Sequence, residues 1–369
     1  MRIDKLFLQN FRNYGEQAVC FDPNCNVIFG ENAEGKTNLL EALSYLSCGQ
    51  SLRARREQEL IRFGQEEAKL TGEIFARDRN FQVEAELFRG KRRKIRINGV
   101  PAKNSAALSD VFRTVFFCPD DLNLIRNGSA ARRRFLDTAL SQLRPRYADA
   151  LREYRRCYEQ KTRILRDFAE KPDLLKALPD FNEGMIRYGA VLIRYRARYA
   201  LRLSEYAAAN HLECSGKREA LEIRYQTVSA ISDPAGAELE AQLRAHMERH
   251  SQAELASRLC LSGPHKDDLL VTINGQEARA FSSQGQTRTA ALSMKLAERE
   301  ILKNDSGEYP VLLLDDVLSE LDPRRQEFVL NRILGGQVLI TCCEDDRLAQ
   351  LLGGRVFHVK NGTIGSAAE

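Results

Sequence analysis

The sequence has no apolar run long enough to span a membrane, and its first residues, Met1–Lys5, do not form a secretory signal. Its nine cysteines include no Cys-x-x-Cys pair, which argues against zinc ligation and against a disulfide framework. We therefore expect a protein of a reducing cytoplasm with no membrane partner. Cys342 and Cys343 are adjacent, and we expect both to be ordinary small buried residues.

The 369 residues are 43% hydrophobic and 29% charged, which predicts a folded chain of one large or two ordinary domains. The net charge of +5 is unevenly distributed. The segment 126–202 contains 19 basic and 9 acidic residues, a net charge of +10, so the rest of the chain carries −5. This asymmetry suggests that one part of the protein binds a polyanion.

The sequence contains one phosphate-binding loop of the pattern G-x-x-x-x-G-K-T. An apolar strand is expected before it, at Asn26–Phe29, and a helix after it, at Asn38–Leu46. Glycines let such a loop point its N–H groups at phosphates, and its lysine and threonine serve the β- and γ-phosphates and Mg²⁺. The predicted ATP-binding residues are Gly30, Glu31, Asn32, Ala33, Glu34, Gly35, Lys36 and Thr37.

A second motif is the apolar run Val311–Leu314 followed by Asp315 and Asp316. Continuous apolar runs are typical of central parallel strands, which are covered on both faces. At the end of such a strand Asp315 would hold Mg²⁺ together with Thr37, and Asp316 would polarise the attacking water. Lys36 and Asp316 are therefore the predicted catalytic residues.

Three features permit two interpretations each. Arg12 precedes the phosphate-loop strand and is either a nucleotide contact or a surface charge. His265 lies beside two carboxylates, which indicates a structural loop or, less simply, a metal site. Ser283 and Gly285 begin the helix expected at Thr287–Leu302, and a helix N-terminus can bind an anion. That turn is therefore either structural or a phosphate site offered to another subunit.

The patterns predict an α/β fold with three segments. Residues 1–125 would contain the phosphate loop, 126–210 a basic helical arm, and 211–369 the acidic strand. The arm is expected to be a hairpin of two long helices, the second covering Asn182–Ala209. Strands are expected at 5–8, 18–21, 68–75, 81–88, 94–97, 115–118, 219–226, 269–273 and 337–341, and further helical segments at 59–64, 237–259 and 324–334.

Basic residues outside the arm are also candidates for contact with DNA phosphates. They cluster after the phosphate-loop helix and at the tip of a predicted hairpin. A solvated charge run is the alternative for both groups and for the arginines of the arm. The candidates are Arg53, Arg55, Arg56, Arg92, Arg93 and Lys94.

Taken together, these pieces resemble the ABC-type ATPase heads of the SMC class. The phosphate loop, the Ser-Gly-Gln signature, the acidic strand and a Leu-Asp loop follow one another in the expected order, with room for an inserted arm. The resemblance implies that residues 1–125 and 211–369 are the two halves of an ATPase head and that the arm, residues 126–210, is inserted between them. Within that class the chain is most similar to the RecF family. The segments that carry the resemblance are Leu8–Tyr14, Gly30–Glu41, Glu59–Gly64, Arg132–Asp137, Gly263–Asp268, Ser283–Thr289 and Leu312–Asp322.

The resemblance implies an ATP- and Mg²⁺-dependent protein that forms a homodimer on ATP and is a weak, DNA-stimulated ATPase. It further implies binding to single-/double-strand junctions of gapped DNA, and recombinase loading with RecR and RecO during repair of stalled replication forks and the SOS response. Site roles carry over residue by residue. The resemblance places ATP against the phosphate loop, Arg12 and Asn13. It places Ser283, Gly285 and Gln286 against the γ-phosphate of an ATP molecule held by a second copy. The D-loop of the family corresponds to Leu321 and Asp322.

The sequence departs from the general ABC pattern in three ways. Asp316 stands where a catalytic glutamate is usual, no histidine follows the strand ending at Thr341, and no lid glutamine follows Val115–Cys118. Because phosphoryl transfer depends on placement, we expect slow hydrolysis. Two other interpretations are an ATPase subunit of a transporter or of another SMC-like system, and a structural DNA-binding protein with a vestigial nucleotide site.

Overall fold

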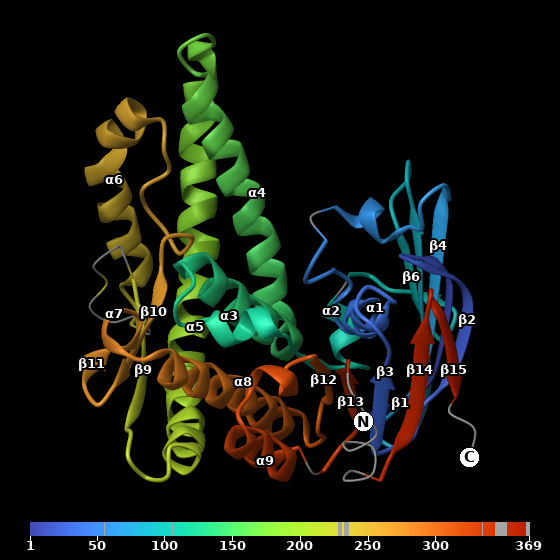
Figure 1. Ribbon diagram of the computed structural model, residues 1–369. Helices are drawn as coiled ribbons and strands as arrows, with labels where there is room; N and C mark the ends of the chain where they lie inside the picture. The colour runs from blue at the N-terminus through green and yellow to red at the C-terminus, as the bar shows by residue number, and fades with distance from the viewer. Residues whose placement is uncertain are drawn as a thin grey trace. The chain divides into compact units, whose positions relative to one another are not determined.

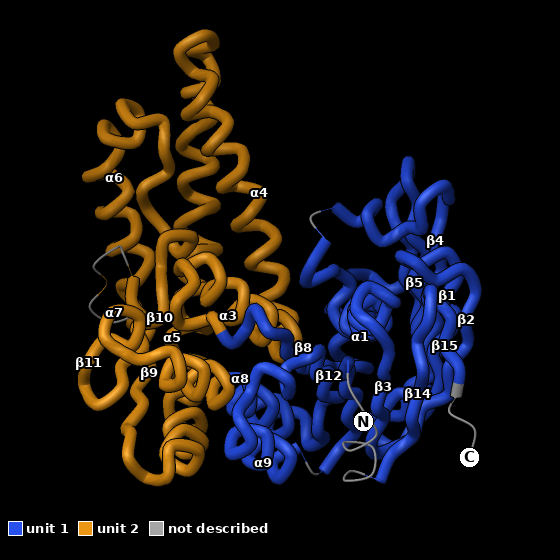
Figure 2. Tube along the Cα trace, viewed as in Figure 1, with its two compact units in different colours: residues 1–122, 295–369 blue, residues 123–294 orange. Residues whose placement is uncertain are grey.

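The computed structural model describes residues 1–54, 56–104, 106–227, 231, 236–333, 335–343 and 353–366. The chain divides into two compact units (Figure 2). Met1–Leu122 and Lys295–Glu369 form the first, and Asn123–Met294 form the second. In the sequence, the second unit is thus inserted into the first. In the described part of the chain, no helix is both long and apolar enough to cross a membrane.

A six-stranded sheet in the order β15-β14-β3-β13-β12-β8 forms one layer of the first unit (Figure 1). All neighbours are parallel except β14 and β15. Every residue of β12 and β13 is buried, which explains their continuous apolar sequences. β14 and β15 were not among the predicted strands. The strands are β3 (Cys25–Phe29), β8 (Thr114–Phe117), β12 (Val311–Asp315), β13 (Val338–Cys342), β14 (Arg355–Lys360) and β15 (Thr363–Ser366).

The second sheet of this unit is antiparallel, in the order β2-β1-β4-β5-β6-β7. Helix α1 (Lys36–Cys48) shares a hydrophobic core with it. A Cβ on Gly72 of β4 would lie 3.0 Å from Leu46 Cδ1, so the small residue lets the helix pack closely. Asn98 and Gly99 both have positive φ, as a tight hairpin requires. The strands are β1 (Arg2–Phe11), β2 (Tyr14–Cys20), β4 (Glu67–Ala76), β5 (Arg79–Phe88), β6 (Lys94–Ile97) and β7 (Val100–Pro101).

The inserted unit contains the predicted helical hairpin, formed by α4 (Pro145–Asp167) and α5 (Leu178–Cys214). A separate helix, α3 (Ser129–Leu143), precedes the hairpin and ends before Pro145. Arg144 is extended, as the residue before a proline tends to be, and Pro145 then begins α4.

This unit also extends further than the arm expected at 126–210. A small sheet, in the order β11-β10-β9, and helix α6 belong to it. The backbone N–H of Ile223 donates to Ser204 Oγ of α5 at 2.9 Å, which ties the sheet to the arm. Sequence periodicity identifies such elements but not the unit into which they pack. They are β9 (Leu221–Gln226), β10 (Asp268–Ile273), β11 (Gln276–Glu277) and α6 (Leu239–Ser257).

The remaining elements complete the chain, and one expectation among them was wrong. The segment 59–64 was expected to end a helix at Gly64, but the turn η1 ends at Leu60 and Ile61 bridges to Phe11. Hydrogen bonds from Arg12 N to Leu60 O and from Arg62 N to Asn10 O hold this segment beside β1. The remaining elements are η1 (Glu57–Leu60), α2 (Ala106–Ser109), η2 (Pro119–Asn123), η3 (Pro172–Ala177), α7 (Ala278–Phe281), α8 (Gln284–Ser306), η4 (Leu318–Glu320) and α9 (Pro323–Arg332).

A buried polar network fixes the base of the helical hairpin. The guanidinium of Arg196 in α5 donates to Asp137 Oδ1 of α3 at 2.7 Å, to the Pro264 carbonyl at 2.7 Å and to Tyr147 Oη of α4 at 2.9 Å. The Tyr147 hydroxyl in turn donates to Asp137. Burial raises the pKa of the Tyr147 phenol well above its ordinary value, so it remains a donor. One arginine thus joins three helices and the loop before β10.

We predict that Arg196→Leu lowers the free energy of unfolding by about 3–5 kcal/mol, because it leaves the Asp137 carboxylate buried without its partner. The double variant Arg196→Leu/Asp137→Leu should recover part of the loss. Urea unfolding followed by circular dichroism measures both, with Arg198→Leu as the control because Arg198 is on the exposed side of α5. Equal losses for Arg196→Leu and Arg198→Leu would contradict this role.

Candidate functional site

The phosphate loop lies between β3 and α1, as the sequence predicted. Gly30 packs so closely on β14 that a Cβ would come within 2.2 Å of the Val359 carbonyl oxygen. Gly35, with φ of 121°, immediately precedes α1. Lys36 is only 4% exposed, and its ammonium donates to the Gly30 carbonyl at 2.7 Å and to the Glu31 carbonyl at 3.3 Å. The loop therefore curls around its own lysine at the N-terminus of a helix, where anions are favoured.

Thr37 and Asp315 meet at the ends of neighbouring elements. The Thr37 hydroxyl donates to Asp315 Oδ1 at 2.8 Å, and the Thr341 hydroxyl of β13 donates to the same oxygen at 2.9 Å. Burial raises the pKa of the Asp315 carboxyl, although these two hydrogen bonds oppose the shift. A hydroxyl and a carboxylate in contact are the oxygen ligands that Mg²⁺ prefers, so these two side chains fit a magnesium ion.

Asp316 follows β12 in a left-handed backbone conformation, with φ of 52°. Its N–H donates to Thr341 Oγ1 at 2.9 Å, which fixes this turn. The bend brings Asp316 Oδ2 to 3.9 Å from Lys36 Nζ. The structure therefore brings together two pairs of neighbouring residues, Lys36–Thr37 and Asp315–Asp316, which lie far apart in the sequence.

Asn13 contacts the phosphate loop directly. Its side-chain amide donates to the Glu34 carbonyl at 2.7 Å, and its oxygen accepts from Asn38 of α1 at 2.9 Å. Arg12 lies beside the loop and pairs with α1, and its contact with a nucleotide stays a prediction. Its guanidinium forms a two-pronged pair with the buried carboxylate of Glu41, at 2.9 and 3.0 Å, so it braces α1 from beside the loop.

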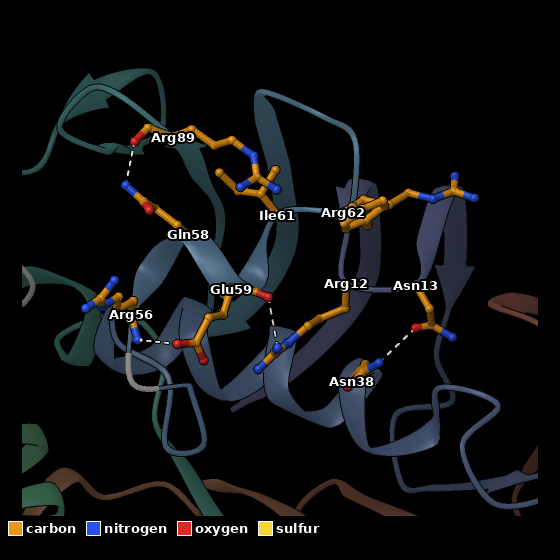
Figure 3. Close-up of a pocket in the computed structure, with 10 residues that line it drawn as sticks. Arg12, Asn13, Asn38, Arg56, Gln58, Glu59, Ile61, Arg62 and Arg89 are labelled. Atoms are coloured by element: carbon orange, nitrogen blue, oxygen red, sulfur yellow. Dashed lines mark hydrogen bonds between the residues drawn. The ribbon is translucent and has the colours of Figure 1, made fainter.

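A cavity of about 860 Å³ opens beside this end of α1 (Figure 3). Asn13 and Asn38 form part of its wall, so it adjoins the phosphate loop. Phe63, on its wall, has 98% of its surface exposed. Four arginines give the cavity a positive character. The lining residues are Arg12, Asn13, Asn38, Arg56, Gln58, Glu59, Ile61, Arg62, Phe63 and Arg89.

The predicted signature residues form a closed turn at the start of α8. Gln286 N donates to Ser283 Oγ at 3.2 Å, and Ser283 N donates to Gln286 Oε1 at 2.8 Å. This reciprocal pair is a capping box, in which two side chains satisfy backbone donors at a helix start. Gly285 lies within the turn. The Gln286 side chain is thus turned back onto its own helix in this structure.

The Leu321–Asp322 loop leads into helix α9. Leu321 is buried, and Asp322 is the N-cap of α9, where Oδ1 accepts from Arg325 N at 3.1 Å. The hydrogen bond and charge of Arg325 lower the pKa of the Asp322 carboxyl against the opposing effect of desolvation.

One residue at the site was not anticipated. Cys342 is buried in β13 as expected, but Cys343 is exposed. The Cys343 thiol accepts from Lys36 Nζ at 3.2 Å and donates to Asn32 Oδ1 at 2.9 Å. It follows the strand after which the sequence has no histidine. Only the long-range pairing of β13 with β3 places it there, so no local pattern could have shown its role.

The basic candidates fall into two groups. Arg53, Arg56, Arg92 and Lys94 are exposed. Arg93 instead forms a salt bridge with Glu57 and lies over the Tyr45 ring, so it is held by the protein itself. Arg55 lies outside the described residues.

His265 supports the structural interpretation. Its Nε2 donates to the Cys260 carbonyl at 3.1 Å, so Nδ1 accepts from the Tyr154 hydroxyl at 2.7 Å. Burial lowers the pKa of this imidazole to about 4. Both ring nitrogens are engaged, and among the described residues no group of three His, Cys, Asp or Glu side chains could hold a metal ion.

Comparison with known proteins identifies the family. The family model "RecF/RecN/SMC N terminal domain" matches residues 2–363. The DNA replication and repair protein RecF of Lachnoclostridium phytofermentans is 37% identical over 366 residues, which is 99% of each chain. The chain belongs to the RecF family. RecF of Symbiobacterium thermophilum is similarly close, with 36% identity over 99% of this chain and 98% of its own.

Solved structures agree with this assignment. A structure described as the recombination mediator protein RecF-ATPrS in the RecFOR pathway has a TM-score of 0.92 and 32% identity, covering 100% of this chain and 98% of its own. An SMC head bound to the C-winged helix domain of ScpA has a TM-score of 0.57 and 14% identity, over 100% of this chain and 97% of its own, a likeness of fold alone. The predicted class, an ABC-type SMC-like head with a helical insertion, is confirmed for this RecF-family chain.

We predict that Asp315→Asn raises the melting temperature at neutral pH in the absence of nucleotide and Mg²⁺. The amide keeps an oxygen for Thr37 and Thr341, and it removes a charge whose burial is unfavourable. Because the pKa of Asp315 is raised in the folded state, its ionisation destabilises the protein above that pKa and ceases to do so as the pH falls below it.

The gain in melting temperature from Asp315→Asn should therefore shrink at acid pH. Thermal unfolding of the wild type and the variant at a series of pH values from about 4 to 8 would measure this change. Asp322→Asn is the control with the opposite sign, because the pKa of Asp322 is lowered. A lower melting temperature for Asp315→Asn at neutral pH would contradict the argument.

Proposed function

We propose that the protein is an ATP-dependent DNA-binding protein of recombinational repair and replication-fork maintenance. The observation that carries this proposal is the convergence of Lys36, Thr37, Asp315 and Asp316 at one edge of a parallel sheet. Support also comes from its relatives, which are named DNA replication and repair protein RecF. A similar structure is described as RecF-ATP.

The phosphates of ATP would lie in the loop Gly30–Thr37, where Lys36 exchanges the Gly30 carbonyl for phosphate oxygens. Mg²⁺ would be held by Thr37 and by Asp315, and it would neutralise charge on the β- and γ-phosphates. The base and ribose would occupy the cavity beside α1, because Asn13 and Asn38 belong both to that cavity and to the surroundings of the loop. Phe63 would stack on the base.

Hydrolysis would be slow. Asp316 is one methylene shorter than the glutamate usual at its position. Lys36 Nζ lies 3.9 Å from the Asp316 carboxylate, and this opposite charge makes the carboxylate a weaker general base. A slow reaction suits a switch, in which ATP holds one state and hydrolysis releases it. DNA would accelerate the reaction weakly.

ATP would also join two copies of the chain head to head. The start of α8, with Ser283 and Gly285, would face the γ-phosphate held by the other copy, and the loop of Leu321 and Asp322 would lie at the same interface. Helix N-termini favour anions, which supports this role. Because the Gln286 side chain is hydrogen-bonded within its own turn, we propose that the Ser283 hydroxyl and the backbone N–H groups contact the γ-phosphate.

The dimer would bind gapped duplex DNA at single-/double-strand junctions and act with RecR and RecO to load recombinase. Exposed Arg53, Arg56, Arg92 and Lys94 and the basic inserted unit would contact phosphates. Phosphate contacts are independent of sequence and weaken steeply with salt. Arg93 is a weaker candidate, since breaking its pair with Glu57 would offset the gain.

We predict that Lys36→Met weakens ATP binding roughly tenfold or more, because a charge-assisted hydrogen bond is worth about 1.5–3 kcal/mol. Binding to gapped duplex DNA, with and without ATP, would be measured together with the mass of the complex. ATP should promote both dimerisation and DNA binding in the wild type and neither in the variant. Strong DNA binding that ignores ATP would mean that the basic surface alone holds DNA.

We predict that Phe63→Ala raises the dissociation constant for ATP about 5- to 150-fold, because stacking on a base is worth about 1–3 kcal/mol. Binding of inorganic tripolyphosphate, which has no base, should be unchanged. Val100→Ala removes another exposed apolar side chain and is the matched control. If Phe63→Ala bound ATP as tightly as the wild type, the adenine base would have to lie elsewhere.

A further inference from the structure

A single carboxylate joins the signature turn to the long helix of the inserted unit. Glu219 lies between α5 and β9. Its Oε1 accepts from Gln286 Nε2 at 2.9 Å, and its Oε2 lies 3.0 Å from His211 Nε2. All three residues belong to the inserted unit, so this bridge is internal to one compact body.

The bridge determines how the signature turn is held. Gln286 Oε1 accepts from Ser283 N, and Gln286 Nε2 donates to Glu219. Both ends of one amide are therefore committed, one to the turn itself and the other to the carboxylate. Moving Glu219 would pull the amide and, through it, the Ser283 backbone. Hydrogen bonds to charged groups are among the stronger ones in proteins, so the bond from Gln286 to the Glu219 carboxylate should hold the turn in place.

The other end of the bridge is rigid. His211 is fully buried in the last turn of α5. Ser204, two turns earlier, accepts from Ile223 N of β9 at 2.9 Å, and Glu219 N donates to Ser215 Oγ at 3.3 Å. The segment that carries Glu219 is thus anchored on both sides to the C-terminal end of α5. A shift of that helix end would carry the carboxylate with it.

We propose that Glu219 is a positioning residue for the signature turn, and that it makes the presentation of this turn depend on the position of α5. The inference rests on the proposed function, in which the turn meets ATP held by a second copy. DNA bound by the basic inserted unit would act on α5 and, through His211 and Glu219, on the turn. Glu219 itself contacts neither nucleotide nor DNA.

Glu219→Ala tests the proposal, with Glu222→Ala as the matched control. Glu222 is a neighbouring acidic residue, but it is exposed and pairs with Arg224, away from the signature turn. We expect Glu219→Ala to raise the ATP-dependent dimer dissociation constant about tenfold, equivalent to about 1.4 kcal/mol. Affinity of the monomer for a fluorescent ATP analogue and affinity for gapped duplex DNA in the absence of ATP do not depend on the dimer, so both should stay at wild-type values. DNA should no longer stimulate hydrolysis.

Glu219→Gln separates positioning from charge. It keeps an oxygen that accepts from Gln286, so dimerisation should return to within about threefold of the wild type, a difference well under 1.4 kcal/mol. Wild-type dimerisation and DNA stimulation in Glu219→Ala would overturn the proposal. Equal impairment of Glu219→Ala and Glu219→Gln would also overturn it, because the glutamine retains the positioning oxygen.

A measurement on the wild type removes any dependence on how well Glu219→Ala folds. Gapped duplex DNA should change hydrogen exchange at the backbone amides of 283–287, and an unchanged pattern would overturn the coupling. Failure of the proposed function has a different signature. In that case the wild type itself would not dimerise with ATP, whereas failure of this inference leaves wild-type dimerisation intact.

Discussion

The structure depends on one oxygen atom, Oδ1 of Asp315, which accepts from both Thr37 and Thr341. Asp315 ends β12, Thr341 is the last residue but one of β13, and Thr37 follows the loop after β3. The three strands β3, β13 and β12 lie side by side in one parallel sheet. Parallel strands direct their carboxyl ends to the same edge, so the sheet order itself creates the site. If β13 did not lie between β3 and β12, Thr341 could not hold the acidic strand against the phosphate loop.

Rigid backbone surrounds this oxygen. Gly30 lies against the Val359 carbonyl of β14, and Asp316 keeps a left-handed turn held by Thr341. Non-glycine residues adopt this conformation at a cost in free energy, and such turns persist where their surroundings fix them. The site is therefore built by the edge of the sheet, with Asp316 aimed by a turn that a straight strand end would not provide.

The sequence predicted the central features well because they are local. The phosphate loop, its helix and the apolar run before Asp315 each carry their signal within a few residues. Partners set by tertiary packing gave no such signal, so the pair of Arg12 with Glu41, the thiol of Cys343 beside Lys36 and the bond of Glu219 to Gln286 were not predicted. The helix expected at 59–64 was wrong for the same reason, because backbone pairing with β1 outweighed its apolar spacing. Roles assigned to residues by resemblance remain predictions.

The capping box at the start of α8 has a consequence for chemical selectivity. Ser283 Oγ accepts a hydrogen bond from Gln286 N, so the hydroxyl proton is directed away from the turn. Gln286 Oε1, the other acceptor, is used within the box. The hydroxyl proton of Ser283 is thus left as a donor for a group outside the turn. A phosphoryl oxygen, which only accepts hydrogen bonds, complements such a donor. A serine hydroxyl that had to donate within its own turn could not make this contact.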